Sequence, residues 1–77
     1  PGGWKKRLEL ADLFYASGKW DEALINYKWV VDRHPVLPET WLKMAEILCF
    51  DDQPEAAAEI IERGKQNLKS QLTLPNT

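Results

Sequence analysis

Few side chains in this sequence are of the types that carry out chemistry, and they are scattered. His34 is the only histidine and Cys49 the only cysteine. A metal ion needs several ligands, and a nucleophilic cysteine needs a base held beside it. His34 falls at the expected end of one helix, where a cation is favoured, and Cys49 falls in a different helix. We therefore expect no enzyme, no bound metal and no cofactor.

Composition narrows the classes of partner. The chain has 77 residues and a net charge of −2, whereas a nucleic-acid-binding protein favours a strongly basic face. The longest apolar run, residues 47–50, is too short for a membrane span. A single cysteine fits a reducing compartment. We expect no contact with nucleic acid or membrane and a cytoplasmic or nuclear location, and we regard residues 1–3 as a linker or a cloning remnant.

Apolar residues recur at helical spacing in successive segments of the chain. Gly18 favours the end of the first helix, because glycine adopts positive φ without penalty. Pro38 and Pro54 suit the first positions of the third and fourth helices. The pattern predicts an all-α fold of about four helices, formed by residues near 5–17, 21–34 and 38–50 and by a last helix that begins at Pro54.

The second half of the chain matches the first when it is shifted by 34 residues. Small residues then coincide, Ala11 with Ala45 and Ala23 with Ala57. Large residues coincide as well, in the pairs Leu10 and Met44, Phe14 and Leu48, Tyr27 and Ile61. The register predicts two copies of an antiparallel helical hairpin, residues 4–37 and 38–71, followed by a tail at 72–77.

A helical hairpin repeated every 34 residues resembles the tetratricopeptide repeat. The positions of the family pattern hold Arg7, Leu10-Ala11, Phe14, Ala23, Tyr27 and Pro35 in the first copy, and Trp41, Met44-Ala45, Leu48, Ala57 and Ile61 in the second. The second copy departs from the pattern twice. Lys69 replaces the closing proline, so we expect the last helix to continue through Leu68 to Leu72 as a cap. Asp52 replaces the glycine between the helices, and aspartate tolerates the left-handed conformation.

The resemblance implies a scaffold or adaptor that binds a peptide or helix in a concave groove. The matching groove positions are Lys5, Leu8, Asp12 and Tyr15, and then Glu39, Leu42, Glu46 and Cys49. One subclass of the family holds a C-terminal carboxylate with lysine and asparagine, but leucines and acidic residues stand at those positions here. We therefore expect no carboxylate clamp. Alternatively, Asp12 and Glu46 are ordinary solvated charges.

A second candidate surface lies on the outer face of the second helix. Ile25 and Trp29 are four residues apart, opposite the buried Ala23, whereas the equivalent residues Glu59 and Arg63 form a charged pair. The pair would dock a partner or a second copy of this chain, unless Trp29 lies flat beside Lys or Arg side chains. Leu13 and Trp4 would lie on an open terminal face.

These features favour a protein–protein interaction module over an enzyme. The alternative is a structural element that self-associates through its open terminal faces and the pair of Ile25 and Trp29.

Overall fold

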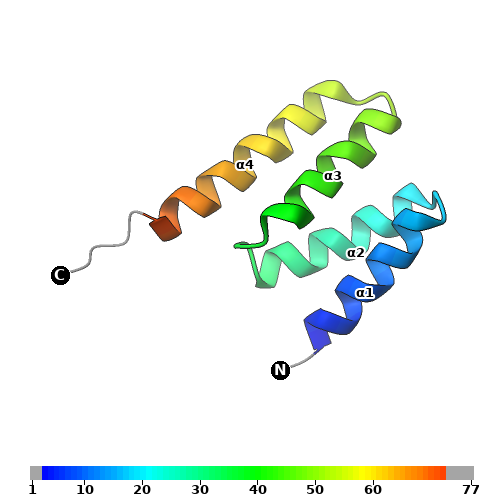
Figure 1. Cartoon of the computed structure of the whole chain (residues 1–77). Coiled ribbons are helices and arrows are strands. Elements are labelled where there is room, and N and C mark those ends of the chain that lie inside the picture. The colour runs from blue at the N-terminus through cyan, green and yellow to red at the C-terminus, as the bar shows by residue number, and fades with distance from the viewer. Residues whose placement is uncertain (1–2, 73–77) are drawn as a thin grey trace.

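The computed structural model describes residues 3–72 and confirms the all-α prediction. It contains α1 (Gly3–Ala16), α2 (Trp20–Arg33), α3 (Pro38–Phe50) and α4 (Pro54–Leu72), and these residues form no strand. The helices follow one another in chain order as two antiparallel hairpins, with α1 and α4 on the outside (Figure 1).

The turns of the two hairpins have the same backbone geometry. Gly18 and Asp52 both have positive φ, 72° and 57°. The next amide in each turn reaches back to the helix end: Lys19 donates to the Phe14 carbonyl at 2.9 Å, and Gln53 donates to the Leu48 carbonyl at 2.7 Å. These bonds satisfy carbonyls that a helix C-terminus leaves unpaired. The left-handed conformation predicted for Asp52 is therefore confirmed, and the two turns are 34 residues apart.

Two helix boundaries bear on the sequence predictions. α1 begins at Gly3, so the first helix includes the last residue of segment 1–3, which the sequence suggested to be a linker or a cloning remnant. α4 continues to Leu72, as the absent proline predicted. Residues 1–2 and 73–77, which include most of the expected tail, lie outside the described residues.

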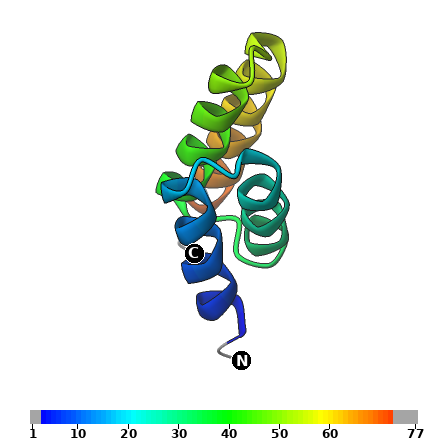
Figure 2. The ribbon, with the colours of Figure 1, turned by 90° about the vertical axis from the view of Figure 1, so that its right-hand side faces the viewer.

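Small residues lie where helices approach closely. Ala11, Ala23, Ala45 and Ala57 are all buried. One buried cluster joins the first three helices and includes Tyr27 and Val31 of α2 with Met44 and Ile47 of α3. In Figure 2 the second hairpin lies above the first, with α3 (green) above α1 (blue). The hairpins are therefore joined through a shared core, and their common boundary, between α2 and α3, is here called the junction.

Candidate functional site

The acidic residues of the predicted groove take part in internal contacts. The Asp12 carboxylate accepts a hydrogen bond from the Tyr27 hydroxyl at 2.5 Å, and its Oδ1 lies 3.1 Å from the Lys43 ammonium. Glu46 accepts a hydrogen bond from the Tyr15 hydroxyl at 3.2 Å. Both sets of contacts link α1 to α3. Asp12 and Glu46 therefore make contacts between the two hairpins while their side chains remain partly exposed to solvent.

The other groove positions divide between the core and the surface. Leu8 is half-buried against the core, whereas its equivalent Leu42 is 56% exposed. Lys5, Glu39 and Cys49 are exposed. The sequence prediction missed Lys43 and Tyr27 as partners of Asp12. The sequence does place Lys43 one helical turn before the predicted groove residue Glu46, on the same side of the third helix. That spacing could have identified Lys43 as a residue near the groove.

The environment of the two tyrosine hydroxyls disfavours their ionisation. Burial, and then the hydrogen bond to Asp12, raise the pKa of Tyr27 far above its usual value near 10. Burial and the nearby Glu46 carboxylate raise the pKa of Tyr15 as well. In both cases the neutral hydroxyl is retained in the folded chain at a pH where the unfolded chain loses the proton.

We expect alkaline pH to destabilise the chain through Tyr27. Because the folded pKa exceeds the unfolded one, the stabilisation is complete below about pH 10 and is lost as pH rises above it. The free energy of unfolding should then fall by about 1.4 kcal/mol per pH unit for this one proton. Urea unfolding between pH 9 and 11.5 measures the slope. Tyr27→Phe should show a shallower decline, and equal slopes in the two proteins would contradict the prediction.

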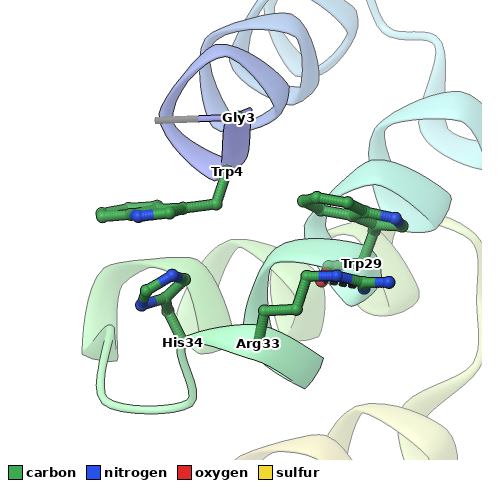
Figure 3. A pocket seen from close by; sticks show the side chains of 5 residues that line it. All are labelled: Gly3, Trp4, Trp29, Arg33 and His34. Carbon is green, nitrogen blue, oxygen red and sulfur yellow. Dashed lines mark hydrogen bonds between the residues drawn. The ribbon is translucent and has the colours of Figure 1, made fainter. Parts of the chain in front are cut away.

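Trp29 is not the open contact surface considered from the sequence. Its ring is half-buried, with the Arg33 guanidinium 3.7 Å and the Arg7 guanidinium 4.6 Å from the ring centroid. Arg33 also donates to the Trp29 carbonyl (Figure 3). This arrangement matches the alternative in which Trp29 lies beside arginine side chains. Ile25 remains 66% exposed, so the expected pair is reduced to one exposed apolar residue.

A hollow of about 350 Å³ separates Trp29 from Trp4 at this end of the first hairpin. Trp4 lies over His34, with ring centroids 4.2 Å apart (Figure 3). Trp4 is therefore half-buried against its own chain, in contrast to the open position expected for it. Arg7 is held by Asn26, to whose side-chain oxygen it donates at 3.2 Å. The aromatic groups of this hollow are thus fixed by neighbours within the first hairpin.

The least covered apolar surface lies on α1. Leu10 and Leu13 are 41% and 65% exposed, whereas the equivalent residues of α3, Met44 and Ile47, are 2% and 1% exposed. The difference arises because α2 covers Met44 and Ile47, and no described helix takes that place beside α1. We call the surface formed by Leu10 and Leu13 the open α1 face. Leu13 was expected there, but the exposure of Leu10 was not.

The opposite end of the stack is also partly uncovered. Ile61 of α4 is 37% exposed, whereas its equivalent Tyr27 is fully buried at the junction. Leu42 and Ile61 line a shallow apolar hollow of about 170 Å³ with Trp41, Gly64 and Leu68. Lys65, at its rim, occupies the position that buried Val31 holds in the first hairpin. The α4 end of the stack is therefore less apolar than the equivalent surface of α2 at the junction.

In a comparison with known proteins, no family model, curated protein or solved structure matches the chain. Among residues 3–72, no group of three or more His, Cys, Asp or Glu side chains is placed to hold a metal ion. Within the same range, no helix has the length and apolar character to cross a membrane.

Proposed function

We propose that this chain is a non-catalytic protein–protein interaction module, similar to a pair of tetratricopeptide repeats, and that a partner helix docks on the open α1 face. The observation that carries the proposal is the contrast between two equivalent surfaces. Met44 and Ile47 are buried by a helix, and Leu10 and Leu13 present the same kind of surface without one. Such a surface fits the apolar side of an amphipathic helix.

Burial energy supports this choice of surface. Covering a large aliphatic side chain completely contributes about 1.5–3 kcal/mol. Burial of the exposed parts of Leu13 and Leu10 by a partner would therefore contribute substantially to the free energy of binding. The groove offers less, because Asp12, Tyr15 and Glu46 already bond to one another or to neighbouring side chains. Leucines and carboxylates at the clamp positions also make an acidic C-terminal tail a poor ligand.

Two surface variants of matched exposure test the proposal. Leu13 and Ile25 are 65% and 66% exposed and lie on different helices. Leu13→Glu and Ile25→Glu therefore introduce the same charge at equally accessible positions. In affinity capture from a cell extract, we expect Leu13→Glu to lose the partners bound by the unchanged chain and Ile25→Glu to retain them. Circular dichroism should show both variants folded, and retention by Leu13→Glu would contradict the proposal.

A second candidate function is self-association by end-to-end stacking. The observation that favours it is that apolar residues are uncovered at both ends, Leu10 and Leu13 on α1 and Leu42 and Ile61 at the other end. Such a contact would be heterologous and would extend into open chains rather than close as a dimer. Sedimentation at several concentrations measures it, and a strict monomer would exclude this function. The charges that would meet in such a contact, Glu46 of one chain and Glu9 of the other, oppose it.

A further inference from the structure

The junction between the hairpins shows which charges a stacked hairpin needs. Asp12 on the first helix of one hairpin faces Lys43 on the first helix of the next, with 3.1 Å between the charged atoms. Tyr27 donates a second hydrogen bond to the same carboxylate. Both partners of Asp12 come from helices that meet at the junction. Stacking is therefore accompanied by a specific pairing of charges as well as by apolar burial.

A second copy of this chain would not reproduce that pairing. Suppose that the α1 face of a second copy stacks onto the α4 end of the first. Glu46 of the first copy then takes the position that Asp12 has at the junction, because the two residues are 34 positions apart. Glu9 of the second copy likewise takes the position of Lys43. Two carboxylates would then face each other. Tyr27, the second donor, would be replaced by Ile61, which has no hydroxyl group to donate. The contact that joins the hairpins would become repulsive between copies.

A second pair of positions leads to the same conclusion. Val31 and Trp41 belong to the buried cluster at the junction. Their equivalents at a contact between copies would be Lys65 of one chain and Arg7 of the other. Two cations would therefore lie in the region that two apolar side chains occupy within the chain. Bringing two cations together in a buried contact is unfavourable, because neither neutralises the charge of the other.

We infer that the open α1 face accepts a helical hairpin of a different protein, one that carries lysine or arginine opposite Glu9. This inference rests on the proposed function and specifies its partner. Glu9 is exposed and makes no hydrogen bond or ion pair with the other described residues, so its carboxylate is available. The partner's cation would face Glu9 as Asp12 faces Lys43 at the junction, so that the ion pair has the opposite polarity. Copies of this chain, which present Glu46 there, are rejected.

The chain itself supplies a surrogate partner for the test. A ligand carrying Leu13→Glu has its own α1 face blocked and can stack only through its α4 end. The same ligand carries Lys65→Val, the residue found at the equivalent position 31, so that no ligand cation faces Arg7 of the receptor. A second ligand carries Glu46→Lys in addition and so presents a cation. The receptor, labelled on the exposed Cys49 and kept at nanomolar concentration, is either unchanged or carries Glu9→Lys. Fluorescence anisotropy then gives the four dissociation constants.

We expect the preference of the receptor to reverse with its charge. The unchanged receptor should bind the Glu46→Lys ligand about tenfold more tightly than the ligand that keeps Glu46, and the Glu9→Lys receptor should prefer the other ligand by a similar factor. The preferences should shrink in 1 M salt. A structural effect of Glu46→Lys, such as the loss of its bond to Tyr15, would act equally on both receptors.

Other outcomes overturn the inference. If both receptors prefer the same ligand, or if neither discriminates, the residue opposite Glu9 does not select the partner. If no ligand binds either receptor, separate chains do not reproduce the junction and the inference also fails. If the unchanged chain binds the Glu46 ligand as tightly as the Glu46→Lys ligand, a second copy is an acceptable occupant. None of these results changes the capture experiment with Leu13→Glu, which tests the proposed function separately.

Discussion

Replacement of Ile47 by alanine is expected to lower the free energy of unfolding by about 2–4 kcal/mol. Ile47 is almost fully buried in the cluster that joins the hairpins, so its truncation removes apolar burial and leaves a cavity. Small domains have total stabilities of about 5–15 kcal/mol, and a chain of this size lies toward the lower end of stability. Urea unfolding followed by circular dichroism measures the loss, and the variant should unfold at a clearly lower midpoint.

Leu13→Ala is the matched control, because position 13 is equivalent to position 47 in the repeat. Leu13 is 65% exposed, and we expect its truncation to change stability by no more than about 0.5 kcal/mol. The difference between the two losses of stability measures the effect of α2, which covers α3, because no described helix covers α1 in the same way. Equal costs at the two positions would show that α1 is covered as well, and the account of the open α1 face would then be wrong.

Gly64→Ala should also destabilise the chain, although alanine is the better helix former. A Cβ atom at position 64 would lie 2.9 Å from both Cβ and Cγ of Trp41. These atoms are close to the backbone and cannot move aside as the end of a flexible side chain would. Overpacking of this kind costs about 1–3 kcal/mol, against the roughly 1 kcal/mol gained in helix propensity. We expect a net loss of up to about 2 kcal/mol in urea unfolding.

A double-mutant cycle with Trp41→Ala provides the control. Alanine removes Cγ and Cδ2, two of the three atoms that the new methyl group would crowd, so Gly64→Ala should cost less in the Trp41→Ala background than in the unchanged chain. The first hairpin shows that a larger residue fits when its neighbour differs, because Val30 and Arg7 occupy these positions there. Additive effects, or a stabilising Gly64→Ala, would mean that Trp41 and Gly64 do not share a tight contact.

Local sequence patterns were sufficient to predict the hairpins. A 34-residue shift aligned the four alanines, and all four are buried at helix contacts. The positive φ of Asp52 followed from its place opposite Gly18 in the repeat. Such features depend on backbone conformation and on residues nearby in the chain, which a single sequence reveals directly.

The surfaces were harder to predict, because they depend on side chains from different helices. Leu10 and Met44 occupy equivalent positions in the repeat, and only the placement of α2 makes one exposed and the other buried. Trp29 loses its expected exposure to two arginines, one of them on another helix. The engagement of Asp12 likewise requires Tyr27 and Lys43 from two other helices. Periodicity within one helix contains no information about these neighbours.

The central claim is that equivalent apolar residues are buried on α3 and exposed on α1. The accessibility of the methyl groups of these residues to solvent tests this claim most directly. In a carbon–proton NMR spectrum recorded with a soluble neutral gadolinium chelate, the methyl signals of Leu10 and Leu13 should be strongly attenuated. Those of Met44 and Ile47 should be nearly unaffected, since these residues are buried. Protection of the Leu13 methyl groups in a monomeric sample, or attenuation of the Ile47 signals, would contradict the account.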